Sequence, residues 1–205
     1  MGRFAGAESD RPGGYTPIVR FSWLSGLLIA ATLSSGCLVL SLQPAYDDAS
    51  IAFDEALLGQ WENSEDQTSL TIERAQWRSY RITTTDRSST HSYQGNLTTI
   101  GNSTFFDVTD ARGNDYGPYL VPVHGIVRVK IDGDTLVGSD LHYDWFRRAM
   151  TRKTLGRLAA AVDDRRNIIL SSTTAELRAW LARAPADAFD PPTTLTRTRV
   201  PGVQR

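Results

Sequence analysis

The sequence predicts a mainly β fold, an antiparallel meander that closes as a barrel or a sandwich. The first observation is an alternation of apolar and polar residues that begins near Leu58 and includes Leu70 and Ile72; this period of two is typical of half-buried strands. The second is Asp132-Gly133 between two alternating runs, which is the strongest short-range signal for a hairpin. The third is the regular spacing of the short strands, which favours a meander.

The N-terminal residues predict a secretory signal peptide. Arg20 precedes an apolar run, Phe21–Leu33, which ends in small residues followed by Cys37. A positive flank, a short apolar core and a small-residue cleavage zone are typical of such a signal. We therefore expect a signal helix within residues 1–36, with cleavage between Gly36 and Cys37.

Cys37 is the only cysteine of the chain and stands where a lipoprotein signal would end. Ser35-Gly36-Cys37 resembles the lipobox of bacterial lipoproteins, in which the Cys is lipidated on sulfur (palmitate is a typical acyl group) and becomes the new N-terminus. Ser34 occupies the position where Leu is usual. Several acyl chains would hold the chain durably at a membrane, because each buried methylene contributes about 0.8 kcal/mol.

Two alternatives concern this leader. An uncleaved signal anchor over Phe21–Leu42 is nearly long enough to span a bilayer, which takes about 20 apolar residues. Residues 1–20 also form a long lead, for which a true start at Val19 is the alternative. With a signal anchor, the basic residues of the lead would keep the N-terminus cytoplasmic. These residues are Arg3, Arg11 and Arg20.

The leader is expected to be followed by a tether and then by one β-rich domain. Residues 37–52 are assigned to the lipidated Cys and the tether, in which Pro44 argues against regular structure. The domain is expected over 53–200, with a disordered tail over 201–205. Within it, Phe53–Leu58 predicts a short helical turn that leads into the first strand.

Aromatic and β-branched residues mark the strand Trp77–Thr85, in which Tyr80 and Ile82 share one face and Arg81 lies on the other. Gly101-Asn102 predicts a turn. Further strands are expected over Ser92–Ile100, Thr104–Val108, Val127–Ile131, Leu136–Val137, Ile168–Leu170 and Thr193–Val200.

Two helices are expected in the C-terminal part. The first covers 144–151, with Asp144 as its cap. The second covers 174–184, because Thr173 and Glu176 have the spacing of a capping box, in which each side chain satisfies a backbone N–H of the other.

Composition excludes several classes of protein. The 205 residues carry a formal net charge of −1, which leaves no broad basic face and argues against nucleic acid as a partner. One cysteine provides no intramolecular disulfide framework. The part that follows the leader is long enough for one domain with its own core.

Gly59-Gln60-Trp61 follows the short helical turn and opens the first strand. A Trp at this position can plug the base of a small barrel, while the Gly permits close backbone approach. The pattern resembles the Gly-x-Trp that opens the first strand of lipocalins. The resemblance implies a lipocalin-like meander barrel.

A wider resemblance covers most of the exported part. The chain is similar to a family of uncharacterised bacterial lipoproteins in which a Ser-Leu-x-Pro-x-Tyr segment leads to a Leu-x-Gly-x-Trp strand. The resemblance implies a lipid-anchored, lipocalin-like β-barrel and no known reaction. The matching blocks are Ser41–Tyr46, Ala56–Trp61, Val121–His124, Asp144-Trp145 and Ser172–Leu177.

Catalytic motifs are missing from the sequence. It contains no His-Glu-x-x-His, no Gly-x-Ser-x-Gly and no Walker-type phosphate loop. An acylated Cys37 cannot act as a nucleophile. We therefore expect no enzyme and no cofactor, with an envelope hydrolase as the remote alternative. Asp140, His142 and Asp144 would share a face if extended, but this pattern is more typical of a solvated strand end than of a metal site.

Aromatic residues on successive strands are the candidate ligand-lining residues. They either line an apolar cup or fill the interior, because a barrel of about eight strands has room for side chains or for one small ligand. The candidates are Trp61, Trp77, Tyr80, Tyr93, Phe105 and Phe106.

These inferences together predict a cell-envelope lipoprotein, anchored through acylated Cys37, that binds a small apolar ligand or an envelope partner. The alternatives are a structural or assembly protein with a filled barrel, and a signal-anchored membrane protein. Leu38 rather than Asp follows the Cys, which by resemblance to enteric lipoprotein sorting favours the outer membrane, facing the periplasm.

Overall fold

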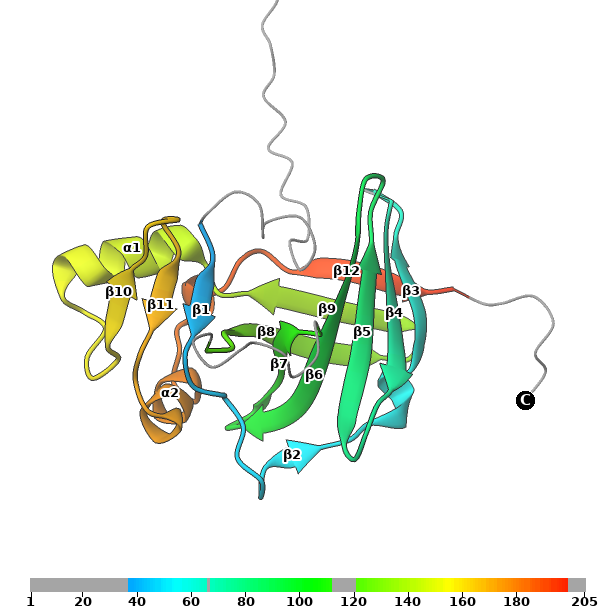
Figure 1. Ribbon diagram of the computed structural model, residues 1–205, viewed down its shortest axis with the longest axis horizontal. Helices are drawn as coiled ribbons and strands as arrows, with labels where there is room; N and C mark the ends of the chain where they lie inside the picture. The colour runs from blue at the N-terminus through cyan, green and yellow to red at the C-terminus, as the bar shows by residue number, and fades with distance from the viewer. Residues whose placement is uncertain (1–36, 66, 112–120, 199–205) are drawn as a thin grey trace, which may run out of the picture.

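The computed structural model describes residues 37–65, 67–111 and 121–198. The predicted signal peptide over 1–36 and the predicted tail over 201–205 lie outside the described residues. A closed barrel fills one half of the molecule, and a smaller sheet with two helices lies beside it (Figure 1).

The barrel consists of eight antiparallel strands, so the predicted mainly β meander is confirmed. Neighbouring strands follow the order β8-β7-β6-β5-β4-β3-β12-β9, and pairing between β8 and β9 closes the ring. The strands are β3 (Gly59–Asn63), β4 (Thr68–Arg74), β5 (Ser79–Thr85), β6 (Thr90–Ile100), β7 (Ser103–Asp110), β8 (His124–Asp132), β9 (Thr135–Asp140) and β12 (Thr193–Arg197).

The hairpin predicted at Asp132-Gly133 joins β8 to β9. Its pairs run from Val127 opposite Asp140 to Asp132 opposite Thr135. Gly133 has φ 57°, a left-handed conformation that glycine adopts without the steric cost of a Cβ. This hairpin places Asp140 at the far end of β9 from the turn.

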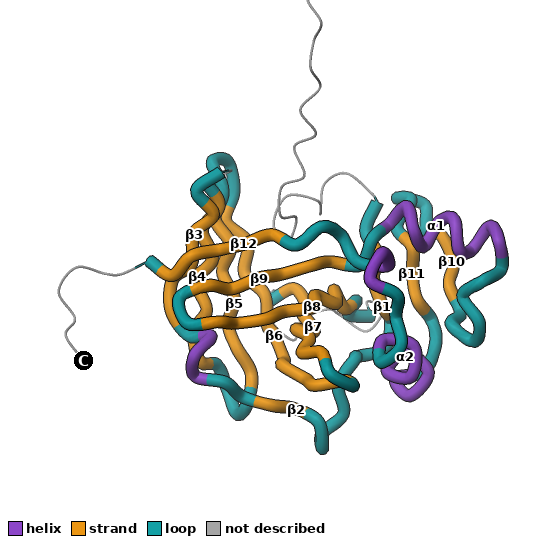
Figure 2. The backbone as a smooth tube through the Cα atoms, turned by 180° about the vertical axis from the view of Figure 1, so that it is seen from behind, coloured by secondary structure: helices purple, strands orange, loops and turns teal. Residues whose placement is uncertain are grey.

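The smaller sheet extends from the start of β8. There β1 (Val39–Ser41) pairs antiparallel with β8 and parallel with β11 (Ile168–Leu170), which pairs with the edge strand β10 (Ala160–Val162). The helices α1 (Tyr143–Arg152) and α2 (Thr174–Leu181) lie beside this sheet (Figure 2). The remaining elements are β2 (Ile51–Ala52), which pairs with β6, and the 3-10 turns η1 (Glu55–Leu57) and η2 (Ala186–Ala188).

The expectation of a free tether over 37–52 is wrong. The segment contains β1 and β2, and its Ser41 and Ala45 are fully buried. The backbone N–H of Ala45 donates to Asp107 Oδ2 at 2.6 Å. The physical reason is that the apolar run after Cys37 completes the side sheet, whereas Pro44 interrupts regular structure only after β1 has ended.

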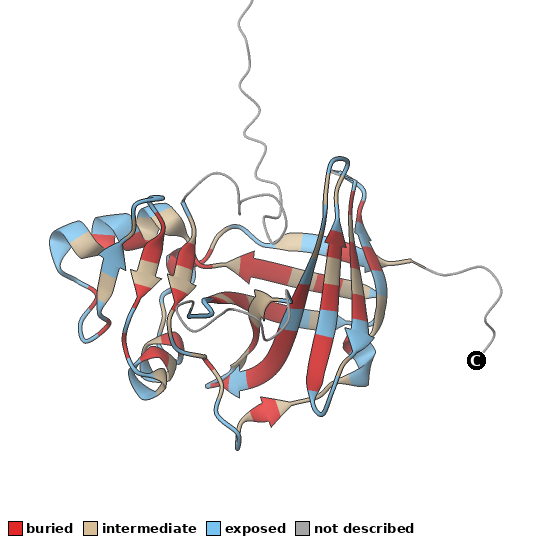
Figure 3. Ribbon diagram, in the orientation of Figure 1, coloured by how far each residue is buried: buried red, intermediate tan, exposed pale blue. Residues whose placement is uncertain are grey.

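Two separate cores result, one inside the barrel and one between the barrel wall, the side sheet and the helices (Figure 3). Phe105 and Phe106 show the division, because successive strand residues face opposite sides. Phe106 packs inside the barrel, and Phe105 packs in the outer core.

Both helices are present near their predicted positions. The capping box of α2 is confirmed, with Thr173 and Glu176 each bonded to the other's backbone. The predicted cap of α1 is wrong: its N-cap is His142, while Asp144 lies in the first turn and pairs with Arg147 at 3.2 Å. The helix begins earlier than predicted because β9 ends at Asp140.

Candidate ligand site at the barrel mouth

One end of the barrel is closed by Trp61. Its ring is fully buried, and its Nε1 donates to the Leu57 carbonyl at 3.0 Å. The guanidinium of Arg197 lies 4.0 Å above the ring and donates to the carbonyls of Leu58, at 2.7 Å, and Ala56. The predicted plug is therefore held in place by a cation–π contact and by the carbonyl oxygens of η1.

The interior above this plug is packed. A cavity of only about 20 Å³ remains inside the barrel, with Phe106, Val108 and Val127 among the apolar residues around it. This is about the room of one water molecule. Four of the six candidate aromatics belong to the barrel core. They are Trp61, Tyr80, Tyr93 and Phe106.

The prediction that the other two aromatics line the interior is wrong. Phe105 is fully buried in the outer core, where its ring centroid lies 6.2 Å from that of Phe189. Trp77 is 67% exposed, with φ 55°. The reason is that β5 begins only at Ser79, so Trp77 belongs to the turn before the strand.

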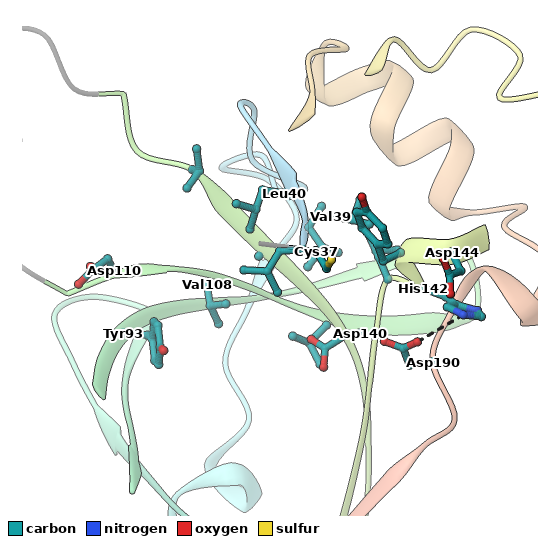
Figure 4. Close-up of a pocket in the computed structure, with 17 residues that line it drawn as sticks. Cys37, Val39, Leu40, Tyr93, Val108, Asp110, Asp140, His142, Asp144 and Asp190 are labelled. Atoms are coloured by element: carbon teal, nitrogen blue, oxygen red, sulfur yellow. Dashed lines mark ion pairs between the residues drawn. The ribbon is translucent and has the colours of Figure 1, made fainter. Parts of the chain in front are cut away.

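A larger pocket opens at the barrel mouth. Its volume is about 530 Å³, within the range of roughly 300–1,000 Å³ of small-molecule sites. Val108 and Val127 border both this pocket and the small interior cavity, so the pocket continues the barrel interior outward. Tyr93 is the one candidate aromatic that lines it, and β1 supplies Val39 and Leu40 (Figure 4).

Carboxyl groups gather on the opposite side of the pocket. Burial raises the pKa of Asp140 to about 7, and the charge of Asp190 adds to the effect. Burial also raises the pKa of Asp190, against the opposing effect of His142, whose Nε2 lies 4.0 Å from Asp190 Oδ1 (Figure 4). The Asp190 backbone N–H donates to the Asp140 carbonyl at 2.9 Å, which fixes the two acids beside each other.

The pocket therefore has apolar walls and an acidic side. Asp110 and Asp144 also line it, and none of its described lining residues is Lys or Arg. Asp140, His142 and Asp144 all border the pocket, but the strand ends before α1 begins, so they do not share one strand face. Within the described ranges no three His, Cys, Asp or Glu residues form a group that could hold a metal ion.

Cys37 stands at the rim of this pocket, because it is exposed and also lines it (Figure 4). Asn167 Oδ1 accepts hydrogen bonds from the backbone N–H groups of Cys37, at 3.3 Å, and Leu38, at 3.2 Å. The Asn167 amide in turn donates to Asp163 Oδ2 at 3.0 Å. The residues of the predicted anchor are thus fixed to the domain.

The same N-terminal segment also contacts a buried pair, His124 and Asp107. His124 Nδ1 lies 2.6 Å from Asp107 Oδ1, while the other carboxylate oxygen accepts from Ala45. Ser41 is paired with His124 in register, but its hydroxyl donates to the Gln43 carbonyl at 2.7 Å. We interpret these contacts as structural, because they hold the N-terminal segment against β7 and β8.

Sequence reasoning missed the acidic side of the pocket and the Asn167 contact. Asp140 and Asp190 are far apart in the sequence and meet only because η2 returns the chain to the end of β9. The apolar Leu38–Leu40 could have indicated β1, but its position directly after the Cys favoured a tether.

Comparison of the chain with protein-family models, curated proteins and solved structures found no match. The fold alone therefore defines the class: a mainly β protein built on a closed, lipocalin-like barrel with few helices. In the parts of the chain that the structure describes, no helix has both the length and the apolar character needed to cross a membrane.

Proposed function

We propose that this chain is a cell-envelope lipoprotein, anchored through acylated Cys37, that binds a small apolar ligand in the pocket at its barrel mouth. The observation that carries the proposal is the pocket itself, about 530 Å³ with apolar walls. Apolar, concave sites with a few polar groups are the usual form of small-molecule sites, and barrel mouths are among their common positions.

The anchor is supported by the sequence pattern around Cys37 and by the resemblance to bacterial lipoproteins. The exposed position of the thiol is compatible with acylation. Leu38 after the Cys favours the outer membrane, with the domain in the periplasm.

The packed interior limits where a ligand can bind. Since the barrel core leaves about 20 Å³, we place the apolar molecule at the mouth, where the pocket offers about 530 Å³. There it would contact the apolar side chains of Val108 and Val127, whose burial would contribute about 25 cal/mol per Å² of apolar surface removed from water.

Extraction tests the ligand. The protein, purified from membranes, is treated with organic solvent and the extract is examined by mass spectrometry. We expect one apolar molecule per chain from the wild type and a large loss from Val108→Trp, which fills the pocket. Thr109→Trp is the matched control, because Thr109 lies next along β7 and faces the other side. Equal extracts from all three proteins would contradict the proposal.

Substitution of Cys37 tests the anchor. We expect Cys37→Ser to lose incorporated palmitate and to leave the membrane fraction, because the acyl chains provide the membrane affinity. A Cys37→Ser protein that stays membrane-bound with its leader uncut would instead support the signal-anchor alternative.

The packed interior also favours a second candidate, a structural or assembly protein that acts through its surface. Its most exposed apolar side chains include Trp77, at 67%. Exposed apolar surface of this kind can mark a protein interface. A photo-crosslinker at position 77 that gives one discrete adduct in the envelope, together with a ligand-free wild-type extract, would favour this candidate.

A further inference from the structure

The predicted anchor has almost no free chain between it and the folded domain. Val39 already belongs to β1, and the Ile168 N–H donates to the Leu38 carbonyl at 2.8 Å. Extended chain covers at most roughly 3.6 Å per residue, so the Cys37 Cα lies within about 7 Å of β1. Because Asn167 also holds the Cys37 N–H, an acylated Cys37 would keep this part of the domain against the bilayer surface.

The same residue stands at the rim of the mouth pocket. Cys37 and Val123 are both exposed and both line the pocket, so they mark its opening to the outside. Acyl chains leaving Cys37 would therefore enter the bilayer beside this opening. A ligand could then pass directly between the bilayer and the pocket. Its apolar chain would not have to enter water, where exposure of apolar surface is unfavourable.

The chemistry of the pocket restricts the head group of such a ligand. Four aspartates line the pocket, Asp110, Asp140, Asp144 and Asp190. Its described lining includes His142, beside Asp190, but no Lys or Arg. A carboxylate or phosphate entering this site would meet more acidic than basic groups, which is unfavourable for an anion. A neutral or amine head group would meet hydrogen-bond acceptors instead.

We infer that the mouth pocket takes a single-chain amphiphile without a negatively charged head group, directly from the bilayer in which Cys37 is anchored. The inference rests on the proposed lipid anchor and ligand binding. It adds the source of the ligand and its chemical class. The pocket volume of about 530 Å³ suits one small molecule.

The test uses the lipidated protein reconstituted in phosphatidylcholine vesicles that contain deuterated hexadecanol or deuterated hexadecanoate. Uptake is followed by native mass spectrometry of protein recovered at timed intervals. In one variant a flexible Gly-Ser linker of 12 residues is inserted between Cys37 and Leu38, which adds about 20 Å between anchor and pocket. The matched control has the same linker after Gly133, at the exposed hairpin turn away from the pocket.

We expect the wild type and the Gly133 insertion to take up hexadecanol at the same rate, and the Cys37 insertion to take it up at least 5-fold more slowly. Hexadecanoate should occupy less than a tenth as many chains as hexadecanol. Equal rates for the two insertions would overturn direct transfer from the bilayer, and equal occupancy by hexadecanoate would overturn the restriction on the head group.

A binding measurement in solution, without a membrane, distinguishes a failure of this inference from a failure of the proposed function. Unlipidated full-length Cys37→Ser protein is titrated with hexadecanol, with and without the Cys37 linker. Equal affinities show that the linker changed access and left the pocket intact. If neither form binds hexadecanol and the extract of the wild type is empty, the proposed ligand binding fails, and the further inference fails with it.

Discussion

The Asn167 side-chain oxygen accepts a hydrogen bond from the backbone N–H of Cys37, 130 residues earlier in the chain, at a distance of 3.3 Å. This contact joins the first described residue to the turn before β11, beside the parallel pair that β1 and β11 form. The domain thus holds the residue of its predicted anchor, and the barrel mouth opens next to it.

Replacement of Asn167 by Ala should therefore loosen the N-terminal segment. The N–H groups of exposed Cys37 and half-buried Leu38 would lose their shared acceptor, and a hydrogen bond of this kind contributes about 0.5–1.5 kcal/mol. Urea unfolding should show a loss of this size for Asn167→Ala and less than about 0.5 kcal/mol for the exposed neighbour variant Asp164→Ala. Equal losses would show that the contact contributes nothing specific.

Asp140 should make the stability depend on pH. Its pKa is raised from 3.8 to about 7 in the folded protein, so the unfolded state loses its proton first as the pH rises. Stability is therefore unaffected below the lower value, falls between the two values, and carries the full penalty above about 7, at most about 4 kcal/mol. The charge of Asp190 raises the pKa of Asp140 further, while His142 acts on Asp190.

The Asp140→Asn variant should remove this dependence. We expect it to unfold at a higher temperature than the wild type at about pH 8 and at a similar temperature at about pH 4, where both side chains are neutral. Asp164→Asn, at an exposed turn, is the control. A variant less stable than the wild type at the higher pH would mean that the ionised carboxyl is stabilised by a contact in the folded protein.

Arg197 should be important for closing the barrel. It lies 4.0 Å above the Trp61 ring, pairs with Asp134 at 3.3 Å and donates to two carbonyls of the turn that precedes β3. We expect Arg197→Met, which keeps an apolar stem, to lose about 2 kcal/mol of unfolding free energy. Chemical denaturation measures this, and exposed Arg165→Met should be near neutral. No difference between the two variants would contradict the assigned role.

Trp77 offers a test of strain in an exposed turn. It adopts φ 55° and is 67% exposed, and a left-handed conformation costs a residue with a Cβ roughly 1–2 kcal/mol. Trp77→Gly should therefore raise the midpoint of thermal unfolding, whereas Trp77→Val should lower it. A destabilised Gly variant would show that the indole makes a stabilising contact.

The same variant also tests the surface role of Trp77. If Trp77→Gly is stabilised but does not restore function to a strain that lacks the protein, a surface role for Trp77 is supported.

The barrel and the second helix could be predicted because their signals are local. The alternation at Leu70 and Ile72, the Asp132-Gly133 turn and the Thr173 capping box all act within a few residues. These patterns follow from side-chain periodicity and turn geometry, which a sequence displays directly. Trp61 was likewise identified from its position after the helical turn.

The candidate site could not be predicted in the same way. The pairing of β1 with β11 involves three residues in each strand and spans most of the chain, and no short-range pattern marks it. The proximity of Asp140 and Asp190 depends on the bridge between Leu141 and Phe189. Phe105 and Phe106 could be placed on opposite faces from their adjacency, but not assigned to an inner or outer core.

We propose that the barrel mouth holds an apolar molecule beside Cys37. Native mass spectrometry of the protein purified gently from membranes tests it most directly. We predict a mass above that of the acylated chain by one apolar molecule, absent from Val108→Trp and retained in Thr109→Trp. A wild-type mass equal to that of the acylated chain alone, unchanged after incubation with hexadecanol, would contradict it.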